Sequence, residues 1–178
     1  TYTAGNSMTA ITLLSHAEAL AALDGLVEIL VDSVNSGASV GFHRPMAVAE
    51  ADAYWQDICA DVGRGRVLLF AAYADGQLAG TAQLQPSPKP NGRNRAEVAK
   101  VLVHSAFRRR GIGRALMDAL EAEARRLGRT TLVLDTRPGD AGEPLYAGCG
   151  YTRVGEIPAY VVDENGRPDA TVFYYKLL

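Results

Sequence analysis

Arginines and glycines gather in the segment from Arg108 to Ala115, which reads Arg-Arg-Arg-Gly-Ile-Gly-Arg-Ala. Apolar residues at helical spacing follow it, so the segment is expected to lead into the first turn of a helix. That turn has unpaired backbone N–H groups and a partial positive charge, and both favour an anion. Gly111 and Gly113 let phosphate oxygens approach the main chain, while the arginines add charge. The segment therefore predicts a phosphate site.

Two other phosphate-binding loops are excluded by the spacing of this segment. The dinucleotide fingerprint G-x-G-x-x-G requires glycine at position 116, which is Leu116, and it normally follows the first strand of a parallel array. A Walker loop requires Gly-Lys-Ser or Gly-Lys-Thr, which the segment lacks. The loop by itself thus indicates phosphate without identifying the phosphate ligand.

Length and composition predict one soluble domain. The 178 residues include 48% hydrophobic and 21% charged residues, with a net charge of −2. We expect Thr1–Ser7 to be a remnant of an expression tag and residues 8–178 to form the domain. Cys59 and Cys149 are too few and too far apart for a disulfide framework or a zinc site, so a cytoplasmic protein is expected. The charge disfavours nucleic acid, and no apolar run is long enough to span a membrane.

The apolar periodicity predicts an α+β fold with a mixed, mostly antiparallel sheet of seven strands and about four helices. An antiparallel meander comes first, and one parallel crossover follows through the helix after the phosphate loop. The expected strands are Met8–Leu14, Val67–Ala74, Gln77–Leu84, Ala96–Val103, Thr131–Asp135, Tyr151–Glu156 and Thr171–Leu178, and the expected helices are Ala17–Asn35, Val48–Val62, Gly113–Leu127 and Gly142–Gly148.

The pattern R-x-x-G-x-G-x-A from Arg108 to Ala115, placed after a strand that ends Val-Leu-Val, resembles the cofactor motif of the GNAT superfamily of N-acetyltransferases. The segment Pro144–Tyr151 resembles the family's helix that ends in the pattern LYxxxGF. The expected order of elements also matches that family over Met8–Leu178. The resemblance implies the acyl-CoA N-acyltransferase fold, acetyl-CoA as cosubstrate and no metal.

A narrower resemblance links this chain to the tabtoxin resistance acetyltransferases. It is carried by four stretches outside the cofactor motif, namely Ser36–Phe42, Lys89–Val98, Leu134–Thr136 and Tyr151–Glu156. One feature departs from the wider family, in which many members have Asn seven residues and Ala four residues before the motif tyrosine. Here these positions are Gly139 and Gly142, with Asp140 adjacent, so a side-chain contact from this helix to the cofactor is left open.

The resemblance also assigns roles along the cofactor. Val101, Leu102 and Val103 are expected to bind pantetheine through their backbone, and a backbone N–H there would polarise the thioester carbonyl. Tyr146 is the candidate acid for the coenzyme A thiolate, and packing of its ring onto the sheet is the alternative. The expected contacts to the cofactor's pyrophosphate come from Arg108, Arg109, Arg110, Gly111, Ile112, Gly113, Arg114 and Ala115.

Glu97 and Asp135 are the candidate general bases. Glu97 stands four residues before Val101 on one strand, so both side chains are expected on one face. Asp135 ends the next strand, near the expected acetyl site. Either carboxylate could accept the proton of the amine or hold its ammonium. The alternatives are a surface ion pair of Glu97 with Lys100 or Arg95, and a turn cap made by Asp135 through Thr136.

The expected reaction is direct transfer of the acetyl group to a primary amine of a small molecule, such as an amino-acid-like toxin or antibiotic. A non-catalytic acyl-CoA sensor and a peptide or protein acetyltransferase remain alternatives. His104 is expected at the loop surface, His43 borders the expected substrate cleft, and Trp55 and Tyr54 are expected in the core. The oligomeric state is not readable from the sequence, and a homodimer is left open.

Overall fold

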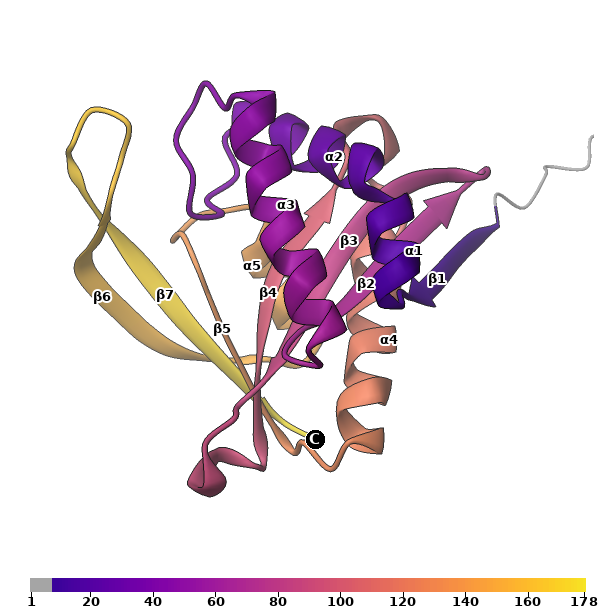
Figure 1. Ribbon diagram of the computed structural model, residues 1–178. Coiled ribbons are helices and arrows are strands. Elements are labelled where there is room, and N and C mark those ends of the chain that lie inside the picture. Colours follow the sequence, from indigo (N-terminus) through magenta and orange to yellow (C-terminus); the bar gives the residue numbers. More distant parts are fainter. Residues whose placement is uncertain (1–7) are drawn as a thin grey trace, which may run out of the picture.

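The computed structural model describes residues 8–178, and the predicted tag remnant Thr1–Ser7 lies outside the described residues. Its centre is a seven-stranded sheet in the order β1-β2-β3-β4-β5-β7-β6 (Figure 1). Only the β4–β5 pair is parallel within this sheet, and the other pairs are antiparallel. The strands are β1 (Thr9–Leu13), β2 (Leu68–Ala74), β3 (Gln77–Pro86), β4 (Arg95–Val103), β5 (Thr131–Thr136), β6 (Thr152–Val162) and β7 (Pro168–Leu177).

Helices cover both faces of the sheet (Figure 1). One core lies between the sheet and α4, and Leu116, Met117 and Leu120 of that helix are completely buried in it. The second core lies on the opposite face, beneath the first three helices, with Trp55 at its centre. The helices are α1 (His16–Ala21), α2 (Leu23–Asn35), α3 (Val48–Gly63), α4 (Ile112–Arg126) and α5 (Gly142–Gly148), with 3₁₀ turns η1 (Pro90–Gly92) and η2 (Ser105–Phe107).

The predicted fold class is confirmed, and two element boundaries are corrected. The single helix expected over Ala17–Asn35 is divided at Ala22, whose N–H is shared between the carbonyl groups of Glu18 and Ala19. The turn there leaves Leu20 46% exposed, although a continuous helix would place it on the apolar stripe. The described chain thus has five α-helices where about four were expected.

The strand β6 is much longer than the expected Tyr151–Glu156. It continues to Val162, although its pairing with β7 is irregular between Ile157 and Val161 and Ala159 has a φ of 52°. Such bulges interrupt the alternation of apolar and polar residues that identifies a strand in a sequence. β6 is also the edge strand of the sheet, so most of its side chains are exposed and carry no burial pattern.

The strands β4 and β5 separate soon after they meet. They are paired at three positions, from Arg95 with Thr131 to Glu97 with Val133. Beyond this point β4 continues along β3 to Val103, while β5 continues along β7 to Thr136. The strands therefore open into a V in the middle of the sheet, and the facing backbone groups of the two strands are left without their usual partners.

No helix within residues 8–178 is both long and apolar enough to cross a membrane.

The packing of α4 against the sheet gives the first prediction. Leu120 is completely buried between α4 and the sheet, so Leu120→Ala should lower the free energy of unfolding by about 2–5 kcal/mol through lost burial and a cavity. The matched control is Leu177→Ala, at a leucine that is 68% exposed. Urea denaturation measures both. Equal losses in the two variants would contradict this description of the core.

Candidate functional site

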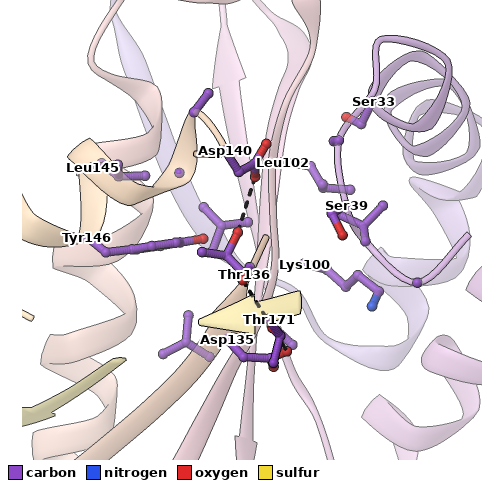
Figure 2. Close-up of a pocket in the computed structure, with 18 of the residues that line it drawn as sticks. Ser33, Ser39, Lys100, Leu102, Asp135, Thr136, Asp140, Leu145, Tyr146 and Thr171 are labelled. Atoms are coloured by element: carbon purple, nitrogen blue, oxygen red, sulfur yellow. Dashed lines mark hydrogen bonds between the residues drawn. The ribbon is translucent and has the colours of Figure 1, made fainter. Parts of the chain in front are cut away.

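A cavity of about 490 Å³ occupies the V between β4 and β5. Its walls come from four parts of the chain that are distant in sequence, with Tyr146 entering from one side and Lys100 from the other (Figure 2). The lining includes residues 97–103 of β4, Asp135 and Thr136 of β5, Asp140, Gly142 and Tyr146 at α5, residues 36–41 after α2, and Thr171 of β7. A cavity lined by carboxylates, a phenol and unpaired backbone can bind and deprotonate a polar ligand.

A β-bulge at Lys100 corrects the predicted geometry of β4. The register with β3 shifts between Thr81 and Gln83, and Lys100 takes the left-handed region with a φ of 51°. The extra residue reverses the alternation, so Val98 and Val101 both pack into the core beneath α4. The expectation that Glu97 and Val101 share one face is therefore wrong, because Glu97 lies on the opposite face of β4 from both valines.

Glu97 and Asp135 line the same cavity, and both residues are exposed. Partial burial raises the pKa of Glu97, and the negative charge of Asp135 raises it further, while Lys100 lowers it. Within residues 8–178 Glu97 takes part in no ion pair, so the surface pair considered from the sequence is absent there. A carboxyl group with a raised pKa is a better proton acceptor near neutral pH than an ordinary glutamate.

Asp135 is held by a residue that the sequence did not suggest. The Thr171 hydroxyl donates a hydrogen bond of 2.8 Å to its Oδ2 atom (Figure 2). The turn after β5 is closed separately, by a bond of 3.2 Å from the Thr136 hydroxyl to Asp140. The turn-cap role considered for Asp135 is therefore taken by Asp140. Thr171 was missed because only the β5–β7 pairing brings it to Asp135.

Tyr146 is buried, at 8% exposure, yet its hydroxyl faces the cavity (Figure 2). Burial raises its pKa, and the nearby Asp140 adds to the shift, so the hydroxyl keeps its proton at neutral pH. Among the described residues it has no hydrogen-bond partner. The ring also contacts Tyr151 and Tyr174 at centroid distances of 6.1 and 6.3 Å. Ring packing and an available hydroxyl thus coexist in one residue.

Gly142 accounts for the unusual sequence before this tyrosine. A Cβ atom at position 142 would lie 3.0 Å from Cε2 of Tyr146 and 3.4 Å from its hydroxyl oxygen. The absent methyl group therefore makes room for the ring. Gly139, with a φ of 79°, forms the turn before α5, and its N–H donates to Glu143 at 2.6 Å. The fold of this chain thus explains both glycines: Gly142 makes room for the Tyr146 ring, and Gly139 allows the turn before α5.

The C-terminal end of α5 is fixed by the partly buried Lys176. Lys176 Nζ donates to the carbonyl oxygen of Cys149 at 2.6 Å and to Glu121 Oε2 at 2.8 Å. At the other end of the helix, Glu143 accepts a hydrogen bond from the hydroxyl of Tyr174. Both ends of α5, which carries Tyr146 beside the cavity, are therefore joined to neighbouring elements.

The predicted phosphate loop begins where the cavity ends. Arg108 lines the cavity, and the loop continues through Arg109, with a φ of 61°, to Gly111, with a φ of 76° at the start of α4. The first helical bond runs from the Ala115 N–H to the Gly111 carbonyl oxygen at 3.1 Å, so the preceding amides have no acceptor within the helix. The amides of this first turn can bind an anion.

The basic side chains of this loop are not all directed to one point. Arg110 forms an ion pair with Asp75 at 3.0 Å, and Arg114 forms one with Asp118 at 3.3 Å. Ile112 is buried in the core, so only its backbone faces the loop. The structure therefore brings Val101–Val103, Arg108, Glu97, Asp135 and Tyr146 together at the cavity, and places Arg109–Ala115 beyond its end.

His43 and His104 join loops near the cavity to neighbouring elements. His43 Nε2 lies 2.9 Å from the carbonyl oxygen of Val162, which links the loop after α2 to the β6–β7 hairpin. His104 is 19% exposed and lies 3.4 Å from Glu28 of α2. Trp55 is in the core, as expected, and Tyr54 is partly buried against the same core, with its ring centroid 5.8 Å from Lys100 Nζ. Neither histidine is part of the cavity wall.

Comparison with known proteins identifies this arrangement. Residues 40–151 match the model of the Acetyltransferase (GNAT) family, and this range includes the bulge of β4, the phosphate loop and Tyr146. An N-acetyltransferase of Azospirillum brasilense, described as uncharacterized and located in the hisH-hisA intergenic region, is 32% identical over 127 residues, which cover 68% of this chain and 72% of the relative.

Solved structures share the fold over almost the whole chain. A ribosomal-protein-alanine N-acetyltransferase of Brucella melitensis has a TM-score of 0.77 and 24% identity, covering 95% of this chain and 99% of its own. A phosphinothricin acetyltransferase of Sinorhizobium meliloti, solved in complex with AcCoA, has a TM-score of 0.78 and 21% identity, with coverages of 96% and 88%. The two names specify different acceptors, so the shared fold leaves the acceptor open.

The contact between Gly142 and Tyr146 gives the second prediction. Gly142→Ala should place a methyl group against the ring, whereas Gly148→Ala, in the same helix, meets no atom within 4 Å. Both changes gain the same helix propensity, so the difference between the two free energies of unfolding reports the clash alone. We expect Gly142→Ala to be the less stable variant by about 1–3 kcal/mol. Denaturant titration measures this difference. Equal stabilities, with unchanged NMR signals of the Tyr146 ring, would contradict the contact.

Proposed function

Because this chain belongs to the GNAT family of acetyltransferases, we propose that it acetylates a primary amine of a small molecule in the cavity between β4 and β5. Membership makes the protein an acetyl-CoA-dependent N-acetyltransferase. The observation that supports the proposed site is the meeting of two carboxylates and a tyrosine hydroxyl on one cavity that ends at the predicted phosphate loop. The small-molecule acceptor and the residue roles are our proposal.

The residues present fit acetyl-CoA. The V between the strands leaves the backbone of residues 98–103 free on the side of β5, which suits the amide groups of an extended arm. Gly111 at the start of α4 adopts a left-handed φ and carries no side chain, so a phosphate can reach the amides of the first helical turn. When bound, acetyl-CoA supplies an activated acetyl thioester.

The carboxylates prepare the amine. An α-amino group has a pKa near 8 and a lysine-like amine one near 10.4, so the acceptor arrives mostly as an ammonium. We assign Glu97 to remove the proton, directly or through water, since its raised pKa suits a base working near neutral pH. Asp135, held by Thr171, would orient the ammonium before the proton leaves.

In this proposal, Tyr146 donates a proton to the leaving sulfur of coenzyme A. Its hydroxyl keeps a proton at neutral pH because burial raises its pKa, and it has no other hydrogen-bond partner among the described residues. It is thus able to donate to the thiolate as the bond to the acetyl group breaks. The backbone N–H groups of Val101–Val103 are the candidates for stabilising the negative charge on the acetyl oxygen.

The acceptor class is proposed from the site and supported by the resemblance to detoxifying acetyltransferases. Two carboxylates beside the acetyl position favour a cationic, amino-acid-like amine. Tabtoxin, its β-lactam product and phosphinothricin are the first compounds to test. A peptide acceptor, as in the name of the Brucella melitensis structure, is an outcome that the same panel must include.

The direct test of the proposed function combines binding and turnover. Calorimetry should show binding of acetyl-CoA, and thiol release should appear with at least one member of a panel of amino acids, diamines, the named toxins and alanine-terminated peptides. Tyr146→Phe and Glu97→Gln should each lower kcat/KM by about 10²- to 10⁴-fold while acetyl-CoA binding is kept. Tyr175→Phe, at a tyrosine on β7 outside the cavity wall, is the control for the first variant.

Each outcome separates the functions under consideration. Binding without turnover on any acceptor would leave a cofactor sensor, and turnover only on peptides would replace the small-molecule acceptor. Absence of acetyl-CoA binding would overturn the proposed site itself.

The pH profile gives a further prediction. If Glu97 is the base, its protonated form is inactive, so kcat/KM falls as the pH decreases through its raised pKa. Asp135→Asn removes the negative charge that raises this pKa, so the acidic limb of the remaining activity should move to lower pH. The decrease of kcat/KM at low pH would belong to another group if its midpoint stayed in place in Asp135→Asn. The same conclusion would follow if the decrease persisted unchanged in Glu97→Gln.

A homodimer and a cytoplasmic location stay predictions. Light scattering on the 19.0 kDa chain tests the first, and fractionation of cells tests the second.

A further inference from the structure

We infer that Lys100 binds an acidic group of the acceptor, so that this site selects amino acids and related zwitterions over simple amines. This inference rests on the proposed function and assigns a specificity-determining residue to it. The structural basis is the position of Lys100 in the bulge of β4, its aromatic surroundings and its place in the wall of the cavity that the two carboxylates also line.

The bulge aims the Lys100 side chain at the cavity. Lys100 is a non-glycine residue in the left-handed region, with a φ of 51°, where most L-residues pay a steric cost. In a regular strand the alternation would continue, and Lys100 would take the face of Val98, which packs into the core. The bulge instead places the lysine in the cavity wall between Ala99 and Val101.

Two aromatic rings hold the ammonium group in place. Lys100 Nζ lies 6.0 Å from the ring centroid of Phe42 and 5.8 Å from that of Tyr54, within the range of a cation–π contact. The rings contact each other edge to face, with centroids 5.2 Å apart. The Tyr54 hydroxyl also accepts a bond of 3.0 Å from Gln83. The ammonium is thus positioned by groups that leave its N–H donors unused.

No carboxylate of the described chain forms an ion pair with Lys100. Within residues 8–178 it forms no ion pair and donates no hydrogen bond, although Glu97 and Asp135 are close enough to raise its pKa. Burial lowers the same pKa. A purely structural lysine in this position would be expected to pair directly with one of the carboxylates.

The arrangement of charges matches a zwitterion. Glu97 and Asp135 provide negative charge for the ammonium of the acceptor, and Lys100 provides positive charge for its carboxylate or an equivalent acid. A diamine or a simple amine would satisfy the carboxylates but leave the lysine unpaired. An amino acid satisfies both signs at once, so the cavity can discriminate by charge pattern as well as by shape.

The test compares acceptors that differ only in the acidic group. Each amino acid of a panel that includes L-methionine is paired with its carboxamide, and kcat/KM is measured for both at saturating acetyl-CoA. The wild-type protein should prefer the acid. Lys100→Met should lower the acid-to-amide ratio of kcat/KM by about 10- to 100-fold, mainly through KM of the acid, because a charged hydrogen bond is lost. The amide should be nearly unaffected.

Two variants control this experiment. Lys89→Met makes the same change at an exposed lysine in the loop before β4, outside the cavity, and should keep the wild-type ratio. Lys100→Arg keeps the charge and should recover part of the preference for the acid. A drop that is equal for acid and amide, or a wild-type protein that prefers the amide, would overturn the assignment of Lys100.

The inference can fail separately from the proposed function. If no amine is acetylated, the same pairs are titrated by calorimetry into protein saturated with coenzyme A. An acid-to-amide preference in binding that disappears in Lys100→Met supports the inference although turnover is absent. Equal binding of acid and amide, or no binding of either, overturns it.

Discussion

The separation of β4 from β5 is the constraint on which the rest of this structure depends. The two strands are paired at only three positions, and each then follows a different neighbour. A sheet that opens in this way leaves backbone donors and acceptors inside the molecule that must find partners in a ligand or in water. The opening is held by the cores on the two faces, because α4 supports one side and α1, α2 and α3 support the other.

The bulge at Lys100 gives β4 two functions. Before the bulge, the strand presents Glu97 to the cavity and Val98 to the core beneath α4; after it, Val101 and Val103 return to that same core. A regular strand could not keep its valines buried on both sides of this point and also place a lysine in the cavity wall. The strained backbone of one residue therefore lets the strand serve packing and polar chemistry within a few residues.

Tyr146 depends on a different kind of support. Its helix, α5, is only seven residues long, and such a helix has little stability of its own in water. Hydrogen bonds from Lys176 and Tyr174 of β7 join it to the sheet at its two ends. The glycine at position 142 lets the ring lie against the helix that carries it. The hydroxyl is thus placed at the cavity by β7 as much as by its own helix.

The sequence by itself determined what depends on local pattern: most of the helices and strands, the arginine and glycine loop at the start of α4, and the motif around Tyr146. It also singled out Glu97 and Asp135 as candidate bases, because they stand on the strands beside that loop, and the structure places both in the wall of one cavity. Only the tertiary structure decided which face Glu97 occupies, that Thr171 bonds Asp135, and that Lys100 enters the cavity. A one-residue bulge moves every side chain beyond it to the other face of the sheet. Because the bulge arises from the pairing of β4 with β3, the periodicity of residues along β4 alone cannot reveal it.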